Sequence, residues 1–375
     1  MNKLKIIDLF AGCGGLSLGF KKSGYDVLGH VEIDHDCCKT LSENTSSSEA
    51  IINIDITDNA DCFRKLKKSG INKVDGIIGG PPCQAYSIAG RNKNENRMDE
   101  DPRNFLFESF DYLLKKYKPK FFVFENVTGM LSAKPFGIDI NENIFNSFKK
   151  SGYFVRKDFR SCVFDMSEFG IPQKRKRVII FGISKSNNPK HEEIVESFYS
   201  EMIKMKKNKK RTVEDAIGDL PKLLPSKGKE KMSHKATSYF SEHSPRFHNT
   251  RDIKIFQLLA KDIESGKNQL TSTKALRDVY KKYTNKDSSV HKYNVLRWGE
   301  PSNTIPAHLY KDGLRHIHPD PEQARSITVR EAARLMTFPD NYIFSGSNGS
   351  KYKMLGNAVP PAFSAIIAKV IKRII

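Results

Sequence analysis

Residues 4–15, LKIIDLFAGCGG, decide the fold of this 375-residue chain. The apolar run of residues 4–10 predicts a buried strand, and the glycines at positions 12, 14 and 15 predict a tight turn directly after it. Residues 16–23 then have the spacing of a short helix, which Gly24 ends. A strand, a glycine turn and a helix in this order predict the first unit of an α/β fold.

The chain repeats this alternation as far as residue 183. Further strands are predicted at residues 25–31, 50–54, 74–78, 121–124 and 178–182. The pattern indicates an α/β protein with a doubly wound, mostly parallel sheet. The last stretch, residues 350–375, is apolar at helical spacing, and we expect it to pack back onto the sheet. The large domain would then be discontinuous, with residues 1–184 plus about 345–375.

Charge is the strongest signal in the composition. The formal net charge is +20, and residues 184–296 contain 24 Lys and Arg against 14 Asp and Glu. The Lys-rich run at residues 204–211 and the weak periodicity around it predict a second, smaller basic domain with a hinge, at about residues 185–344. Such a surplus favours a polyanionic partner, most often nucleic acid. A solvated lysine-rich surface is the alternative interpretation.

The cysteines and the hydropathy narrow the class of protein. No C-x-x-C pair occurs, which argues against a metal site and predicts reduced thiols in the cytoplasm. No apolar run approaches 18 residues, and the first residues lead into strand-like sequence rather than a signal peptide, so we expect no membrane span. The six cysteines are Cys13, Cys37, Cys38, Cys62, Cys83 and Cys162.

The glycine turn and the strand after it are typical of a nucleotide site. Glycines let a ligand approach the backbone closely, and an acid about 20 residues beyond the turn can bind ribose hydroxyls. Glu32 lies at that distance from Gly12, and Asp55 ends the next strand, where it could accept from an adenine amino group. The pattern does not identify the adenosine-containing cofactor, and a nicotinamide dehydrogenase is one alternative.

A thiol follows the strand of residues 74–78. The sequence GGPPCQ at residues 79–84 predicts a stiff loop that presents Cys83 outside the carboxyl end of a buried strand, where open α/β sheets bind ligands. Glu125 closes another buried strand, so it is predicted at the same sheet edge as a partner for a nucleophile. Arg175 and Arg177 alternate and are predicted on one face of an extended segment. The alternatives are a packing cysteine, a solvent-facing Glu125 and an exposed basic edge strand.

Taken in order, these segments resemble the cytosine-5 DNA methyltransferases of the bacterial and phage modification type. The resemblance covers the chain outside roughly residues 185–290. Departures from the family pattern are Cys13 in the glycine loop and Tyr86, where Phe is usual. The segments that carry it are DLFAGCGG (8–15), GGPPCQAYS (79–87), ENV (125–127), QKRKR (173–177), PSNTI (301–305), TVREAARL (328–335) with FP (338–339), and GNAVPP (356–361).

The resemblance implies the S-adenosylmethionine-dependent methyltransferase fold and a role for each motif. Cys83 would add to C6 of a flipped-out cytosine, Glu125 would bind ring N3 and the exocyclic amine, and Arg177, with Arg175, would lie near the O2 edge. Gln84, Ser87, Arg91 and Gln173 would contact DNA. S-Adenosyl-L-methionine would be bound by Phe10, Ala11, Gly12, Gly14, Gly15, Glu32, Ile33, Asp55, Ile56, Pro82, Asn357 and Val359.

The resemblance also implies the partners. The substrate would be double-stranded DNA, with sequence choice in the basic region of about residues 185–330 and a lid at residues 84–103. A cognate restriction endonuclease acting separately is an open partner, and the expected state is a cytoplasmic monomer of prokaryotic or phage type. Two alternatives stay open, an RNA cytosine-5 methyltransferase of the same fold and a catalytically inactive DNA-binding regulator. The sequence does not reveal the target site.

Overall fold

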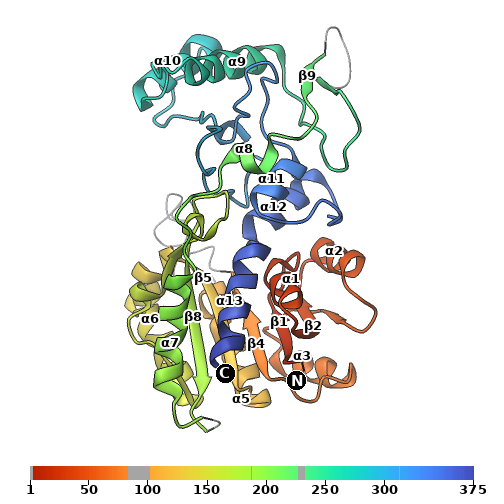
Figure 1. The fold of residues 1–375 in the computed structure, drawn as a ribbon, viewed down its shortest axis with the longest axis vertical. Coiled ribbons are helices and arrows are strands. Elements are labelled where there is room, and N and C mark those ends of the chain that lie inside the picture. Colours follow the sequence, from red (N-terminus) through yellow and green to blue (C-terminus); the bar gives the residue numbers. More distant parts are fainter. Residues whose placement is uncertain (1–2, 83–101, 187, 227–232, 312) are drawn as a thin grey trace.

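The computed structural model describes residues 3–82, 102–186, 188–226, 233–311 and 313–375. Strands and helices alternate in its first half, and helices prevail in the second half (Figure 1). The strands are β1 (Lys5–Leu9), β2 (Asp26–Glu32), β3 (Ala50–Asn53), β4 (Gly76–Gly79), β5 (Phe121–Val127), β6 (Tyr153–Val155), β7 (Val163–Asp165), β8 (Lys176–Ser184), β9 (Leu223–Pro225) and β10 (His234–Ala236). The α-helices are α1 (Gly15–Lys22), α2 (His35–Asn44), α3 (Asn59–Lys68), α5 (Leu106–Tyr117), α6 (Ile140–Lys150), α7 (His191–Lys204), α8 (Val213–Ile217), α9 (Thr250–Glu264), α10 (Thr273–Thr284), α11 (Val329–Leu335), α12 (Asn348–Asn357) and α13 (Pro361–Ile374).

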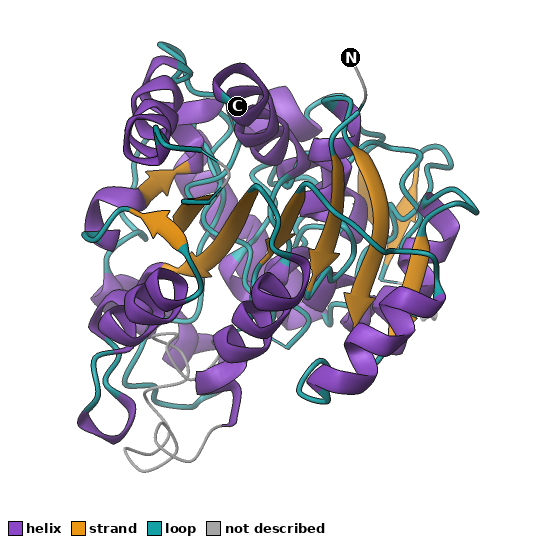
Figure 2. Cartoon of the chain, turned by 90° about the horizontal axis from the view of Figure 1, so that it is seen from below, coloured by secondary structure: helices purple, strands orange, loops and turns teal. Residues whose placement is uncertain are grey.

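The main sheet has the strand order β3-β2-β1-β4-β5-β8-β6, with β7 beside β8. The pairs from β3 to β5 are parallel, and β8 runs antiparallel to β5, β6 and β7. Helices cover both faces of the sheet (Figure 2). Because its strands are buried on both faces, they read as apolar runs rather than as an alternation. The predicted α/β class with a mostly parallel sheet is confirmed, and the strands β1–β5 and β8 all lie where the sequence predicted strands.

The C-terminal helix returns to the sheet, as predicted. Helix α13 packs so closely on α1 that a Cβ on Gly19 would lie 2.5 Å from the backbone nitrogen of Ala365. Its buried side chains join the core of the sheet. The stretch Asn348–Ile374 is long and apolar enough to cross a membrane by composition, but 67% of that window is buried inside the protein. Core packing therefore accounts for its apolar character.

The chain divides into two lobes by their cores. The sheet lobe (the described parts of residues 3–205 and 359–375) contains one large core, which includes the apolar face of α7. The upper lobe (residues 213–358) contains two smaller clusters, one of which extends into the sheet lobe through Cys13 and Cys37. Helix α7 thus packs on the sheet and α12 packs in the upper lobe, while the domain boundaries near residues 184 and 345 stay a prediction.

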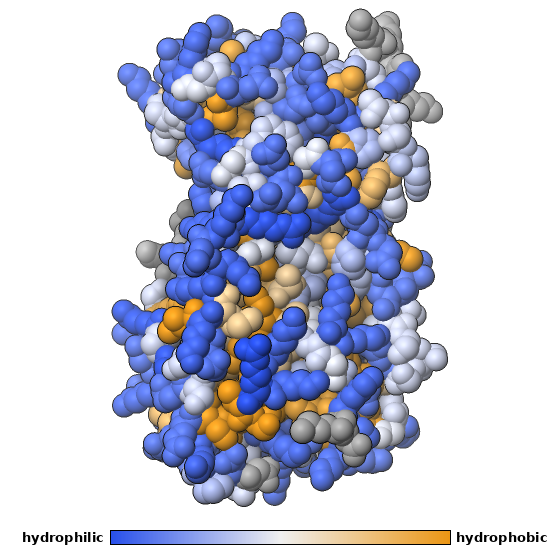
Figure 3. All heavy atoms as spheres, viewed as in Figure 1, coloured by the Kyte–Doolittle hydropathy of each residue, from blue (hydrophilic) through white to orange (hydrophobic). Residues whose placement is uncertain are grey.

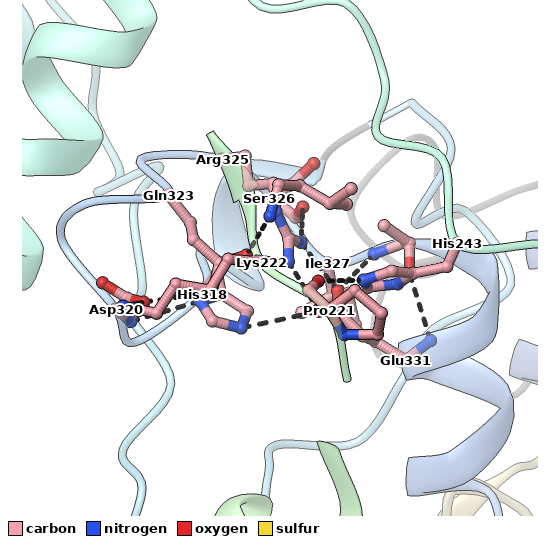
Figure 4. A network of polar contacts seen from close by, with 12 residues as sticks. Pro221, Lys222, His243, His318, Asp320, Gln323, Arg325, Ser326, Ile327 and Glu331 are labelled. Atoms are coloured by element: carbon pink, nitrogen blue, oxygen red, sulfur yellow. Dashed lines mark hydrogen bonds and ion pairs between the residues drawn. The ribbon is translucent and has the colours of Figure 1, made fainter. Parts of the chain in front are cut away.

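A buried polar network holds the upper lobe together (Figure 4). The guanidinium of Arg325 makes two bonds of 2.7 and 2.8 Å to the carboxylate of Glu331, and a third of 2.6 Å to Gln323. Burial tends to raise the pKa of Glu331, but Arg325 more than offsets this and holds the pKa below its ordinary range. His243 joins the network by bridging the carbonyl of Pro221 and the hydroxyl of Thr328, at 2.8 and 3.0 Å.

The network connects segments that are distant in sequence. Residues 221–225 and His243 meet residues 316–331 there, and the short strand β9 is tied in by Gln323, which accepts from the backbone of Leu223. The visible face of the upper lobe is mostly hydrophilic, as Figure 3 shows. The described part of the upper lobe thus has its own helices and hydrophobic clusters, although the sequence there showed only weak periodicity.

Candidate active site

The strand order reverses between β1 and β4, and the candidate site lies at this switch point. β1 has β2 on one side and β4 on the other, so the loops that follow β1 and β4 emerge at the same edge of the sheet. Such a crevice outside the carboxyl ends of parallel strands is where open α/β sheets bind ligands. The predicted glycine loop and the predicted nucleophile loop are these two loops.

The glycine loop has the backbone shape that only certain residues accept. Phe10, Gly12 and Gly14 have φ angles of 56°, 55° and 77°, in the left-handed region. A Cβ on Gly12 would meet no heavy atom within 4 Å, whereas one on Gly15 would lie 2.3 Å from the carbonyl oxygen of Val359. Gly15 is therefore required by packing, and the space beside Gly12 is open to a ligand.

Glu32 closes the loop at the end of β2. Its carboxylate accepts from the backbone N–H of Gly12 at 2.7 Å and from those of Ile33 and Asp34 at 2.9 Å each. Burial raises the pKa of Glu32, and these three N–H donors counteract the rise. A carboxylate fixed beside an open glycine backbone suits the hydroxyls of a ribose.

Other predicted cofactor residues surround this point. Ile33 is 62% exposed, so its apolar side chain is available for contact with a ligand. Asp55 is exposed, and its Oδ1 atom accepts from the backbone and hydroxyl of Thr57. The next residue, Ile56, is buried. Open space at Gly12, a fixed carboxylate and an exposed apolar side chain together fit S-adenosylmethionine.

The C-terminal motif meets the glycine loop from the other side. Val359 is buried against Gly15, and Asn357 is exposed at the end of α12. Ala11 is buried and Phe10 is partly buried, while Pro82 is exposed at the end of the described nucleophile loop. The predicted cofactor residues thus lie at or after the ends of β1, β2, β3 and β4, at the last residue of α12 and two residues after that helix.

Glu125 and Arg177 form an ion pair across the strands. In the antiparallel register of β5 and β8, Glu125 faces Ile179 and Val127 faces Arg177, so the two charged side chains are diagonal neighbours on one face. The Nε atom of Arg177 lies 2.9 Å from Oε1 of Glu125, and both side chains are largely buried. Burial lowers the pKa of Arg177, and Glu125 counteracts this.

The loop after β4 passes directly over this pair. A Cβ on Gly80 would lie 2.7 Å from Oε2 of Glu125, so a larger residue would displace the carboxylate. The amide of Asn126 donates to the carbonyl of Pro81 at 3.5 Å. We did not predict roles for Gly80 and Asn126, although the paired glycines before Pro81 were a visible signal of close backbone approach.

Two arginine-motif residues have roles that differ from the prediction. Gln173, predicted to contact DNA, is fully buried, and its amide bonds to the backbone N–H of Ile305 and the sulfur of Met336. Arg175, predicted near the cytosine, is also fully buried, and its guanidinium bonds to the carbonyls of Gly356 and Ala358. Both side chains face the upper lobe and the C-terminal motif. Gln173 and Arg175 therefore pack against and anchor these segments in this structure, instead of facing DNA or cytosine as predicted.

The predicted nucleophile Cys83 and the predicted DNA contacts Gln84, Ser87 and Arg91 lie outside the described residues. On this side the described residues end at Pro82, two residues after Gly80, which lies beside Glu125. Within the described ranges no group of three or more His, Cys, Asp or Glu residues is arranged to hold a metal ion.

Comparison with known proteins agrees with this geometry. Residues 4–373 match the family model described as C-5 cytosine-specific DNA methylase. The chain is 33% identical to the Type II methyltransferase M.Bpa9945I of Bacillus paralicheniformis, with 99% of each chain covered. It is 32% identical to M.DdeI of Desulfomicrobium norvegicum, over 98% of this chain and 88% of the relative.

Solved structures give the same fold. A putative DNA modification methyltransferase encoded within an E. coli prophage superposes with a TM-score of 0.66 at 26% identity, with 99% of each chain covered. The Dnmt2 methyltransferase of S. pombe has a TM-score of 0.60 at 15% identity, which supports the fold alone. The chain therefore belongs to the C-5 cytosine-specific DNA methylase family, and it is a DNA cytosine-5 methyltransferase related to the Type II modification enzymes.

Proposed function

We propose that the edge of the sheet beside Glu125 and Arg177 methylates a cytosine that has left the duplex, with Cys83 as the nucleophile. The observation that carries this is the buried Glu125–Arg177 pair directly under the loop that leads to Cys83. A target base must leave the stack to reach such a pocket. Thiolate addition at C6 would make C5 nucleophilic, so that C5 could take the methyl group of S-adenosylmethionine while S-adenosylhomocysteine leaves. Loss of the C5 proton and of the Cys83 thiolate would then release 5-methylcytosine.

Glu125 would select cytosine and activate it. A carboxyl group that shares a proton with ring N3 and accepts from the exocyclic amine makes C6 more electrophilic, and it disfavours thymine, which has no such amine. Arg177 would hold this carboxyl in place through the 2.9 Å contact and offer its remaining N–H groups to the O2 edge. The positive charge of Arg177 would also favour the thiolate form of Cys83.

The glycine loop would bind S-adenosylmethionine, a cofactor that the family and the fold imply. Phe10 and Ile33 would contact the adenine, Glu32 the ribose hydroxyls and Asp55 the adenine amine, while Asn357 and Val359 would close the methionine end. When bound, this cofactor supplies an electrophilic methyl group. Support comes from the open space at Gly12 and the fixed position of the Glu32 carboxylate.

Sequence choice would lie in a target-recognition domain of about residues 185–344, which includes most of the upper lobe. Its lysine and arginine side chains would contact phosphates, and a few others would read bases in the major groove. Residues 84–103 would form a lid over the target base, with Gln84, Ser87 and Arg91 as DNA contacts. We propose that the chain acts as a monomer in the cytoplasm, with any cognate restriction endonuclease acting separately.

One experiment tests the chemistry and finds the target site. Plasmid DNA from cells that express the chain is bisulfite-sequenced, in parallel with DNA from cells that express Cys83→Ser. We expect one short sequence to be methylated at cytosine C5 in the first sample alone. Methylation of transfer RNA but not of DNA would contradict the proposal, and so would methylated DNA from the Cys83→Ser cells.

A further inference from the structure

A tyrosine of the upper lobe supports the glycine loop. The hydroxyl of Tyr342 donates to the backbone carbonyl of Cys13 at 2.5 Å, and the tyrosine side chain is 5% exposed. The same hydroxyl lies 3.1 Å from the position of a Cβ on Gly14. Cys13 lies between Gly12 and Gly14, so this one bond fixes the peptide between the two glycines that have left-handed φ angles.

The residues that follow Tyr342 form hydrogen bonds with helix α2, which follows the strand that ends at Glu32. The side chain of Asn44, at the end of α2, donates to the carbonyl of Ile343 at 2.7 Å and accepts from its N–H at 3.0 Å. The hydroxyl of Thr40, also on α2, accepts from the N–H of Ser345 at 2.9 Å. Helix α2 begins three residues after Glu32, the predicted ribose contact.

These residues form a rigid brace, which we define as residues 342–345. The ring of Tyr342 packs against those of Phe338 and Phe344, with ring centroids 4.9 and 5.2 Å away, and these two rings also contact each other. A further tie links the lobes beside the brace, where Lys353 of α12 pairs with Asp34 at 2.8 Å. The brace therefore holds the glycine loop and α2 at a fixed separation, from a lobe that is distant in sequence.

We propose that Tyr342 is a positioning residue for the cofactor, and that the brace couples the shape of the cofactor site to the upper lobe. The inference rests on the proposed placement of S-adenosylmethionine at Gly12 and Glu32. Without the hydroxyl, the carbonyl of Cys13 loses its partner, and the loop samples shapes in which the N–H of Gly12 no longer holds the Glu32 carboxylate beside the open space at Gly12. Cofactor affinity then falls by the fraction of molecules that keep the competent shape.

The test is Tyr342→Phe, which removes one oxygen and keeps the packed ring. Loss of one buried hydrogen bond predicts a rise of about fivefold to tenfold in KM for S-adenosylmethionine and in the Kd of S-adenosylhomocysteine by calorimetry. The kcat at saturating cofactor and the Kd for a duplex oligonucleotide should stay within about twofold. Tyr239→Phe is the matched control, because Tyr239 lies in the same lobe and is 92% exposed.

Two further variants distinguish a brace without a positioning role from a wrong placement of the cofactor. Asn44→Ala removes the tie to α2 and should raise the same KM, while Glu32→Ala tests the cofactor placement itself. If Glu32→Ala weakens cofactor binding and Tyr342→Phe does not, the brace has no positioning role. If neither variant changes cofactor affinity, the placement is wrong and the proposal falls with it. A Tyr342→Phe protein that loses cofactor and DNA affinity equally, with a lower Tm, would show a purely structural role and overturn the inference.

Discussion

The substitution Arg175→Lys tests whether Arg175 anchors the fold rather than taking part in the reaction. Its guanidinium is fully buried and donates to three backbone carbonyls, those of Ile305 at 3.3 Å, Gly356 at 2.9 Å and Ala358 at 2.8 Å. Burial lowers the pKa of Arg175 well below its ordinary value, and the nearby charge of Arg177 adds to this effect. The side chain thus ties the start of β8 to the C-terminal motif, and Arg175→Lys should damage stability rather than chemistry.

The expected loss of stability follows from the planar shape of the guanidinium group. A lysine ammonium is a point donor, and it cannot reach three carbonyls that a planar guanidinium spans. At least one carbonyl loses its partner, at about 1–3 kcal/mol, and the bonds that remain are less well aligned. We therefore expect a loss of about 2–4 kcal/mol in the free energy of unfolding, which a protein of ordinary stability survives.

Urea unfolding at equilibrium measures this loss, and the methylation rate of the folded protein at saturating cofactor measures the chemistry. Arg177→Lys is the matched comparison, since Arg177 contacts Glu125 instead of the C-terminal motif. We expect Arg175→Lys to keep kcat within about threefold and Arg177→Lys to lose about 100-fold with little change in stability. An Arg175→Lys protein that is as stable as the parent but catalytically dead would refute this reasoning.

Further predictions concern the nucleophile, the cofactor, a buried acid and sequence choice. Cys83→Ser should abolish methyl transfer and keep DNA binding in a gel shift, because a hydroxyl is a far weaker nucleophile; activity within about tenfold of the parent would exclude covalent catalysis there. Phe10→Ala should weaken S-adenosylmethionine binding by about tenfold in calorimetry and leave the Kd for DNA unchanged, and an unaltered cofactor Kd would place the adenine elsewhere. Burial raises the pKa of Asp8 from 3.8 to about 6. The ionised carboxylate therefore destabilises the folded protein increasingly as the pH rises from about 4 to 6, and this destabilisation persists at higher pH. Asp8→Asn should therefore raise stability by about 3 kcal/mol near pH 7.5 and have little effect near pH 4, as judged by urea unfolding at both pH values; an equal effect at both would contradict a titration of Asp8. Replacing residues 185–330 by the counterpart of a relative with another specificity should change the methylated site in bisulfite sequencing, and an active chimera with the old site would assign specificity to the sheet lobe.

Local sequence patterns were sufficient to predict the strands of the sheet and the edge of the sheet at which the candidate site lies. The apolar runs predicted β1 to β5 and β8, because strands buried on both faces need apolar side chains throughout. The glycine turn, Glu32 and Glu125 were also predictable, since residues at strand ends in a parallel sheet meet at one edge. The antiparallel direction of β8 was not predicted, and neither were the short strands β6, β7, β9 and β10, because strands of three residues have too few positions to show a period.

By itself, the sequence determined the fold class, the order of motifs and which residues lie at the sheet edge, because these depend on local periodicity and on which residues end each strand. Only the tertiary structure decided which polar side chains serve the site and which serve the architecture. Arg175 and Arg177 are two positions apart and look alike in sequence, yet Arg175 bonds to residues 130 and 181 positions away, while Arg177 pairs with Glu125. Tyr342 reaches the glycine loop across 329 positions. The burial of a side chain depends on such distant contacts, and no local pattern of residues records them.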